Sequence, residues 1–447
     1  MYEEFLKRKS VTDVYGGFDA EDLNVNLFDF QEAIVRWALK KGRSAVFADT
    51  GLGKTLMQLS WADAVADYTG KPVMIVAPLC VAQQTVEEGA HFGITVTYMR
   101  HQSEVNGHRI IITNYEMIQH FDASQFIGVV LDESSILKGE DSKTRMATIA
   151  KFAETPYRLS CTATPSPNDY MELGSQAEFL GVMKHTEMLA MFFTHDGSDT
   201  SKWRLKGHGK TKFWEWLATW AAFIRSPTDL GFDGSRYKLP PMHMVDCQID
   251  VDAPRANTMT ERRNARKVSI DARCRLLADM VNMSDEPWVI WCNLNDESAL
   301  LASLIPDAVE VFGSLPSSKK EELITKFSHG NARVIISKPK ICGFGLNWQH
   351  CRNVAFVGLD DSYEKFYQAV RRCYRFGQKR EVCTYIIYTS AEGAVKDNLD
   401  RKQAQADVMA DQMVSHMREF TRREVVGTIR ERTDYAPKKF INLPSWM

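Results

Sequence analysis

The chain has 447 residues, of which 44% are hydrophobic and 25% charged, a balance that is ordinary for soluble globular domains. At ~150 residues per domain, this length predicts two or three domains, each able to bury a core. The formal net charge of −2 excludes attraction of nucleic acid through a strong overall field, so any such site must be a local patch.

No apolar run reaches the ~20 residues that a membrane-spanning helix needs, and the first ten residues lack the apolar core of a secretory signal. The nine cysteines are scattered without a CxxC pair, which is typical of reduced thiols rather than of a disulfide framework. We therefore expect a cytoplasmic protein with no membrane partner.

Short β-rich runs alternate with helix-length segments in two stretches of the chain. In the first stretch the expected strands are 44–48, 72–77, 109–113, 126–132 and 157–161. In the second stretch they are 287–292, 308–312, 332–337, 353–357 and 382–388. Near-continuous apolar runs separated by helices are typical of buried parallel strands. The sequence therefore predicts an α/β protein of two lobes, each a parallel sheet flanked by helices.

The segment between the two stretches differs in composition. Residues 203–212 are basic and contain glycine, which indicates a mobile loop, and residues 213–225 place apolar side chains at helical spacing. We expect the tryptophans of 213–225 to pack in a hydrophobic core. Pro240 and Pro241 resist both helix and central strand, so we expect the hinge between the lobes there. The predicted domains are a first lobe at 1–170, a helical and basic insertion with the hinge at 171–240, a second lobe at 241–400 and a polar helical tail at 401–447.

The string VFADTGLGKT at 46–55 carries an apolar strand into a turn with two glycines. Glycines let a backbone approach a ligand with its N–H groups turned inward, and a helix that begins at once adds its positive end. Ala48 stands where the strict GxxxxGK[ST] pattern has its first glycine, so the string fits the AxxGxGKT variant. In this P-loop, Lys54 would reach the outer phosphates of a nucleotide and Thr55 would ligate Mg²⁺. The loop residues expected to cradle the phosphates are Thr50, Gly51, Leu52 and Gly53. An ordinary strand-to-helix turn is the structural alternative.

The string VVLDESS at 129–135 ends an apolar strand in two carboxylates. Ligands collect at the carboxyl edge of an open α/β sheet. We expect Asp132 to hold Mg²⁺, directly or through water, and Glu133 to orient and deprotonate an attacking water. Such a pair also fits a solvated strand end, but its place after a phosphate loop favours a nucleotide-hydrolysing site.

The string QAVRRCYRFGQKR at 368–380 brings two arginines, Arg372 and Arg375, three residues apart, so on a helix they would share a face. Aimed across a cleft, they could neutralise charge that grows on the γ-phosphate, and such an arginine finger contributes roughly 10³–10⁵ in rate. A solvated basic helix is the alternative. The Gly-Gln step after Phe376 would end the helix at a defined point, which favours the finger.

These motifs, in this order, resemble the superfamily-two helicases and, within them, the Swi/Snf-type DNA translocases. The resemblance runs from about residue 28 to residue 400. It implies two tandem RecA-like lobes with the ATP site in the cleft between them, and Gln31 as the residue that reads adenine. The string TATP at 162–165 resembles the family segment that couples hydrolysis to lobe movement.

In the second lobe the resemblance implies further nucleotide contacts. CGFGLNWQ at 342–349 is similar to the family segment that touches both DNA and nucleotide. The residues expected to contact the nucleotide are Gly345 and Asn347 of this segment and Gln368 of the string at 368–380. One departure is Arg371, which stands where the family usually has glycine.

The resemblance implies an ATPase that uses ATP and Mg²⁺ to move along double-stranded DNA as a helicase or translocase. The short junction between the lobes favours a minimal motor from a bacterium, a virus or a mobile element over a nucleosome remodeller. Two alternatives stay open, an RNA-dependent helicase and a nucleotide-gated nucleic-acid clamp with little turnover. Candidate backbone contacts are the basic residues of 203–212 with Lys338, Lys340 and Lys379, and the tail is a possible contact for a protein partner.

Overall fold

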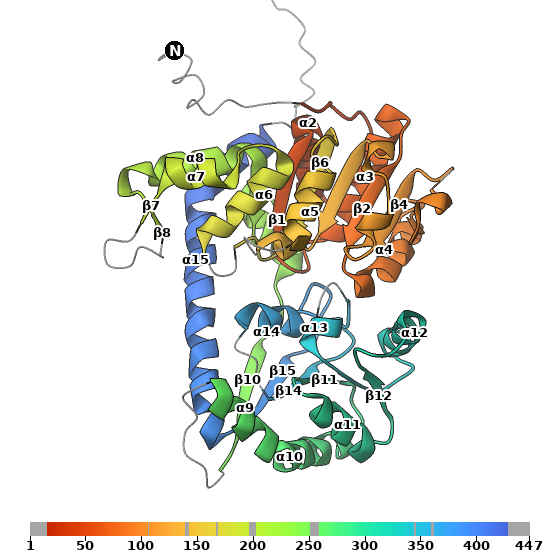
Figure 1. The fold of residues 1–447 in the computed structure, drawn as a ribbon, viewed down its shortest axis with the longest axis vertical. Helices are drawn as coiled ribbons and strands as arrows, with labels where there is room; N and C mark the ends of the chain where they lie inside the picture. The colour runs from red at the N-terminus through yellow and green to blue at the C-terminus, as the bar shows by residue number, and fades with distance from the viewer. Residues whose placement is uncertain are drawn as a thin grey trace, which may run out of the picture.

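The computed structural model describes residues 16–105, 107–138, 143–166, 169–195, 203–250, 259–343, 346–358 and 362–427. Within them the chain forms two parallel sheets, one above the other in Figure 1, each enclosed by helices, and a small separate hairpin. The predicted α/β architecture of two RecA-like lobes is confirmed.

The first sheet has seven strands in the order β3-β4-β2-β5-β6-β1-β9, and all neighbours are parallel. Its strands are β1 (Arg43–Ala48), β2 (Val73–Ala77), β3 (Thr97–Tyr98), β4 (Ile110–Asn114), β5 (Gly128–Asp132), β6 (Tyr157–Thr162) and β9 (Ala221–Ile224). Its helices are α2 (Asp29–Lys41), α3 (Lys54–Thr69), α4 (Leu79–His91), α5 (Lys143–Lys151), α6 (Leu173–Leu180), α7 (His185–Phe192) and α8 (Lys210–Trp220).

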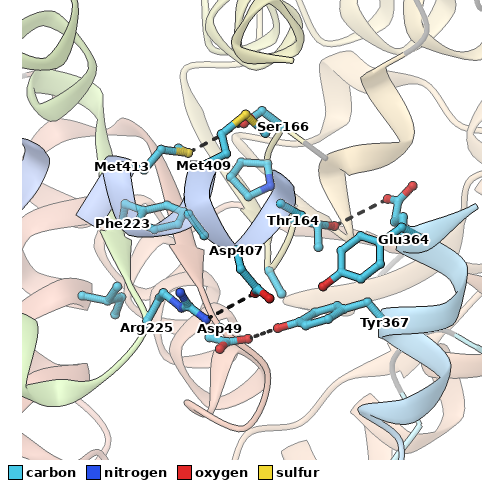
Figure 2. A pocket seen from close by; sticks show the side chains of 16 residues that line it. Asp49, Thr164, Ser166, Phe223, Arg225, Glu364, Tyr367, Asp407, Met409 and Met413 are labelled. Atoms are coloured by element: carbon cyan, nitrogen blue, oxygen red, sulfur yellow. Dashed lines mark hydrogen bonds and ion pairs between the residues drawn. The ribbon is translucent and has the colours of Figure 1, made fainter. Parts of the chain in front are cut away.

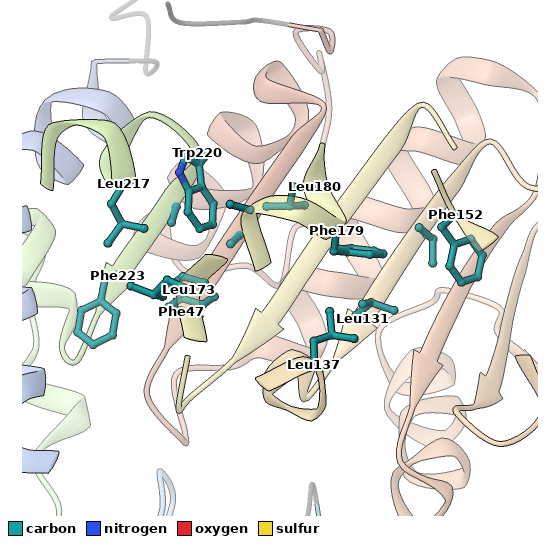
Figure 3. Close-up of a cluster of buried hydrophobic side chains, with 14 of the residues drawn as sticks. Phe47, Leu131, Leu137, Phe152, Leu173, Phe179, Leu180, Leu217, Trp220 and Phe223 are labelled. Atoms are coloured by element: carbon teal, nitrogen blue, oxygen red, sulfur yellow. The ribbon is translucent and has the colours of Figure 1, made fainter. Parts of the chain in front are cut away.

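Both faces of this sheet are buried, which explains why its strands read as unbroken apolar runs. Along β1 the side chains alternate, so Phe47 enters the core beneath α6 and α8, while Val46 enters the core beneath α2 and α3. Figure 3 shows the first of these cores, where Phe47 lies near Trp220 and Leu173. Full burial of a large apolar side chain contributes about 1.5–3 kcal/mol. These two cores hold the strand ends in place.

The second sheet has six strands in the order β10-β15-β14-β11-β13-β12, again all parallel. Its strands are β10 (Met242–Ile249), β11 (Trp288–Cys292), β12 (Ala308–Val311), β13 (Val334–Ser337), β14 (Asn353–Val357) and β15 (Val382–Thr389). Its helices are α9 (Met259–Val268), α10 (Ile270–Asn282), α11 (Asn295–Leu304), α12 (Ser317–Ser328), α13 (Pro339–Cys342), α14 (Tyr363–Val370) and α15 (Gly393–Val426).

The connecting segment differs from its prediction in three places. The helical pattern of 213–225 ends early, because α8 stops at Trp220 and the next four residues form β9, which pairs with β1. An open edge of β1 outweighs local helical spacing there. Trp203–Leu205, expected in a mobile loop, is strand β8, paired antiparallel with β7 (Phe193–His195). Strand β10 was not predicted; it begins directly after Pro241 and is an edge strand, the place where a sheet accepts such an end.

The long helix α15 has 34 residues, about 50 Å at 1.5 Å per residue. In Figure 1 it runs beside both lobes, from the second sheet up to the first. Near its end Glu424 pairs with Lys41 of α2 at 3.0 Å, and Arg418 pairs with Asp229 at 3.0 Å. At its start Lys396 pairs with Asp246 of β10, so the helix ties the two lobes together. Among the helices of the described residues, none combines the length and the apolar character that crossing a bilayer requires.

Candidate functional site between the lobes

The P-loop leaves β1 at Ala48 and enters α3 at Lys54. Gly51 and Gly53 have φ angles of 87° and 79°, a region that suits glycine. A Cβ on Gly51 would lie 2.7 Å from the backbone nitrogen of Phe376, so the second lobe packs directly on the loop. Lys54 Nζ donates to the carbonyl oxygen of Ala48 at 2.7 Å and to that of Asp49 at 3.2 Å. The lysine thus caps its own loop, poised beside the place where phosphates would bind.

Gln31 lies on α2 with 3% of its surface exposed, against the same loop. Its Nε2 donates to the carbonyl of Leu52 at 2.9 Å, and its Oε1 accepts from the backbone N–H of Phe28 at 2.9 Å. A side chain on Gly53 would collide with this amide. Gln31 is therefore held against the P-loop by contacts with Leu52 and Phe28.

The acidic pair lies at the end of β5, one strand removed from β1. Gln58 Nε2 donates to Asp132 Oδ1 at 2.7 Å. Burial, together with the charge of Glu133, raises the pKa of Asp132 to about 6. Glu133 is buried, has a φ angle of 53°, and accepts from Thr162 Oγ1 at 3.3 Å. Among the described residues it is the one non-glycine with positive φ, a conformation that costs of order 1 kcal/mol and points to a functional constraint.

The two arginines follow α14 instead of lying on it. The helix ends at Val370, so the prediction that Arg372 and Arg375 share a helical face, ended by the Gly-Gln step, is wrong. Turns bring the two side chains together all the same, because both donate to the carbonyl of Leu346, at 3.2 and 2.9 Å. Arg372 also donates from Nε to the carbonyl of Gln368 at 2.8 Å.

Charges from both lobes influence one another across the cleft. Burial lowers the pKa of Arg372, and the charge of Glu133 in the other lobe opposes this shift. Burial and then the charge of Arg372 lower the pKa of Arg375 to about 10. Burial also lowers the pKa of Lys54, against the charge of Glu133. Such perturbed groups in one cleft are typical of a functional site.

The segment 162–165 connects the acidic pair with the second lobe. Thr162 donates to Glu133, as described, and Thr164 lies within hydrogen-bonding distance of two residues of α14. Its Oγ1 donates to Glu364 Oε1 at 3.5 Å and accepts from Gln368 Nε2 at 3.4 Å. A movement of α14 can therefore alter the contacts of Glu133 through Thr164 and Thr162.

Among the described residues, two buried acceptors at the cleft have no hydrogen-bond partner, Oε1 of Gln368 and Oδ1 of Asn347. An unpaired buried acceptor costs about 1–3 kcal/mol, so a ligand that donates to it is favoured. Thr55 is half-buried in the first turn of α3. Gly345, the remaining predicted contact, lies outside the described residues.

The donor set fits a magnesium-bound nucleotide. The Thr55 hydroxyl and the Asp132 carboxylate are the hard oxygen ligands that Mg²⁺ prefers, and Mg²⁺ usually takes one or two carboxylates together with substrate phosphates. In the described part of the chain, no group of three or more His, Cys, Asp or Glu side chains could hold a metal by itself. A metal shared with phosphates is therefore the arrangement that these residues can support.

The sequence reasoning missed a second set of cleft residues. Asp49 accepts from the Tyr367 hydroxyl at 2.6 Å and pairs with Arg371 at 3.5 Å. The aromatic rings of Tyr237 and Phe376 lie 4.7 Å apart between centroids, beside the P-loop. The departure of Arg371 from the family's usual glycine was the one signal in the sequence that pointed to this set.

Two family profiles match the chain. The SNF2-related domain matches residues 30–202, and the helicase conserved C-terminal domain matches residues 271–377. Together they account for well over half of the chain. The chain belongs to the Swi/Snf-type branch of the superfamily-two helicases. It carries the ATPase core of that family, so the resemblance inferred from the motifs is confirmed.

Several known proteins resemble this Swi/Snf-type core. Protein p41 of Acyrthosiphon pisum secondary endosymbiont phage 1 is 30% identical over 175 residues, which cover 34% of this chain and 38% of that protein. The SWI/SNF-related matrix-associated actin-dependent regulator of chromatin subfamily A-like protein 1 of Drosophila melanogaster is 22% identical over 430 residues, 84% of this chain and 55% of that protein. The chain spans only part of the length of these curated relatives. A solved SWI2/SNF2 ATPase core of Sulfolobus solfataricus in complex with dsDNA aligns with a TM-score of 0.43 and 17% identity, over 91% of this chain and 98% of that one.

Proposed function

We propose that this chain is an ATP-dependent DNA translocase, in which ATP hydrolysis between the lobes drives movement along double-stranded DNA. The observation that carries the proposal is the composite cleft. The P-loop and the acidic pair come from one lobe, and two arginines, the buried Arg372 and the half-buried Arg375, come from the other. Neither lobe alone has the groups that phosphoryl transfer requires.

In this proposal the first lobe binds the substrate. Lys54 exchanges its two loop carbonyls for the outer phosphates of ATP, which are stronger acceptors because they are charged. Gln31 contacts the adenine, and the backbone N–H groups of residues 50–53 cradle the phosphates. Thr55 and Asp132 hold Mg²⁺, which neutralises phosphate charge when it is bound.

Glu133 acts as the base. Its carboxylate accepts a proton from the attacking water, while Thr162 donates to the same carboxylate and fixes its orientation. Arg372 and Arg375 supply positive charge to the γ-phosphate as it separates. Both have backbone partners that hold them in advance, so little reorganisation is needed when charge develops.

For the nucleic acid, the best-supported surface is a basic pocket on the second lobe. A cavity of about 200 Å³ lies where β11, β13 and β14 end, and Lys338, Lys340 and Lys365 are among its lining residues. Lysines at such an edge suit phosphates and carry no sequence code. If both lobes hold one backbone, alternate closing and opening of the cleft moves the protein along it.

The first test is the ATPase rate with and without duplex DNA, single-stranded DNA and structured RNA. We expect duplex DNA to stimulate most. Strongest stimulation by RNA would favour the RNA-dependent helicase, and a rate that no nucleic acid changes would overturn the proposal. A triplex-displacement assay beside a strand-displacement assay then separates tracking along an intact duplex from unwinding.

The second test is Arg375→Ala. We expect kcat to fall by at least ~10³, in line with the loss of an arginine finger, while the affinity for ATP falls much less. Equal losses in kcat and in ATP affinity would mean that Arg375 only binds the nucleotide.

A further inference from the structure

A charged junction lies where the P-loop, α14 and α15 meet, around a cavity of about 70 Å³ (Figure 2). Asp49, directly before the glycine turn, points at Tyr367 of α14, whose hydroxyl donates to Asp49 Oδ1 at 2.6 Å. Arg371 Nη2 lies 3.5 Å from the second carboxylate oxygen, Oδ2. One carboxylate of the first lobe therefore has both oxygens engaged by the second lobe.

The Asp49–Arg371 pair is held in place by aromatic rings and sheltered from solvent. The Arg371 guanidinium carbon lies 5.0 Å from the ring centroid of Tyr367 and 5.4 Å from that of Tyr374, so two rings hold it in cation–π contact. The side chains of Arg371 and Asp49 are 16% and 14% exposed. Salt screens such a sheltered pair much less than an exposed one.

A neighbouring pair belongs to α15. Arg225, just after β9, lies 4.0 Å from Asp407 of α15 (Figure 2). It also lies 2.6 Å from Asp411, one turn further along the same helix. Because Arg225 pairs with these two aspartates, the ion pair of Asp49 is with Arg371. The junction thus joins three bodies. Arg371 with Asp49 and Glu364 with Lys138 are ion pairs between the lobes, and Arg225 pairs the first lobe with the long helix.

We propose that Asp49, Tyr367 and Arg371 form an interlobe latch, in which Asp49 and Arg371 are positioning residues that hold the arginine segment 371–376 against the P-loop. The inference rests on the proposed function and adds residues to it. Asp49 reaches the site through the loop itself, because its own carbonyl accepts from Lys54. Arg371 precedes Arg372 directly, so a fixed Arg371 also fixes where the next arginine points.

If the latch exists, its loss should change both the rate of ATP hydrolysis and the separation of the lobes in the absence of nucleotide. Arg371→Gly and Asp49→Asn each remove one partner, and we expect each to lower the DNA-stimulated kcat about tenfold, since contacting residues couple by factors of roughly 3 to 100. The KM for ATP should change less than about threefold, because the phosphate-binding groups stay in place. Without nucleotide, small-angle X-ray scattering should give a larger radius of gyration for both variants, since the lobes separate more easily.

Further variants separate a latch from a merely structural contact. Arg371→Lys keeps the charge and should recover most of the lost rate. Asp49→Asn combined with Arg371→Gly should be no worse than the poorer single variant. Arg380→Gln is the matched control, because Arg380 pairs at 2.8 Å with Glu286 inside the second lobe. It should leave kcat and the radius of gyration unchanged.

Wild-type rates and radii in the single variants would overturn the latch, as would losses that multiply in the double variant. Should Arg371→Gly not fold, Tyr367→Phe removes only the hydroxyl that reaches Asp49 and should give a smaller effect of the same kind. If the wild type shows no DNA-stimulated ATPase, the proposed translocase fails. The nucleotide-free radii of gyration would still decide for or against the latch.

Discussion

Replacing Asp132 with asparagine should abolish hydrolysis and at the same time stabilise the nucleotide-free protein. Asp132 lies half-buried beside Glu133, and the hydrogen bond from Gln58, the charge of Lys54 and a backbone hydrogen bond from Glu133 only partly compensate its charge. Asparagine has nearly the same shape and keeps an oxygen that can accept from Gln58. The change therefore removes an unfavourable charge without opening a cavity.

The size of the effect follows from the raised pKa. Folding moves the pKa of Asp132 from 3.8 to about 6. At 1.36 kcal/mol per pKa unit, the ionised carboxylate destabilises the folded state by about 3 kcal/mol. The folded state holds the proton more tightly, so the penalty is complete above pH 6, is about half as large near pH 5, and vanishes below the unfolded value. We expect the variant to gain ~1–3 kcal/mol at pH 8, a rise of about 2–6 °C in the Tm of the first lobe, since a unit of about 200 residues shifts by about 2 °C per kcal/mol.

The assay is thermal unfolding in EDTA at pH 5 and pH 8, repeated with MgATP. MgATP should stabilise the wild type more than Asp132→Asn, because only the wild type keeps the metal ligand. Asp279→Asn, at an exposed position on α10, serves as the control and should shift Tm by less than about 1 °C. A variant that is less stable than the wild type at pH 8, or one whose gain does not depend on pH, would refute the reasoning.

Three further predictions concern other residues of the cleft and the second core. Lys54→Ala should reduce ATP binding and hydrolysis together, as measured by nucleotide titration and steady-state kinetics, since it removes the group that we propose neutralises the outer phosphates. Glu133→Gln should keep ATP affinity within about threefold but lower kcat by at least ~100-fold, because a general base contributes roughly 10²–10⁴; equal loss of binding would contradict that role. Arg273→Met should cost about 3–5 kcal/mol in urea unfolding, because it leaves the fully buried Glu297, 2.8 Å away, without its partner. Adding Glu297→Leu should recover most of that stability.

The sequence predicted the central strands of both sheets and missed edge strands, above all β9 and β10. All ten expected strands are present, with ends shifted by at most two residues, because most of them are continuous apolar runs, which report burial on both faces. The exception is β12, an edge strand whose residues are buried alternately. Strand β9 escaped because four small or apolar residues after a helix carry no signal of their own, and the open edge of β1 selects them. Strand β10 escaped because it is a half-exposed edge strand of the second sheet.

In the candidate site, too, the sequence predicted some features and missed others. Local strings identified the P-loop, the acidic pair and the two arginines, because each string carries its own chemistry. Their mutual arrangement was inferred from the resemblance alone. The contact of Asp49 with Tyr367 joins residues 318 positions apart, and no local pattern marks either one. The expected helix under Arg372 was wrong because tertiary contacts, chiefly the Leu346 carbonyl, outweigh the helical spacing.

Three energetically costly features occur together at this cleft, and their coincidence argues for one functional unit. Glu133 adopts positive φ, Asp132 stays beside it at a raised pKa, and two acceptors on the second lobe lack partners. Each feature costs folding free energy of order 1–3 kcal/mol, and none is part of the apolar clusters that pack the two sheets. A charged, phosphate-bearing ligand with a divalent cation would relieve the carboxylate repulsion and supply charge for the arginines at once. The lobes are joined at this cleft by the Asp49 contacts, by the ion pair of Lys138 with Glu364 and by the contacts of Thr164 with α14. A ligand bound there would therefore contact groups that both lobes hold in place.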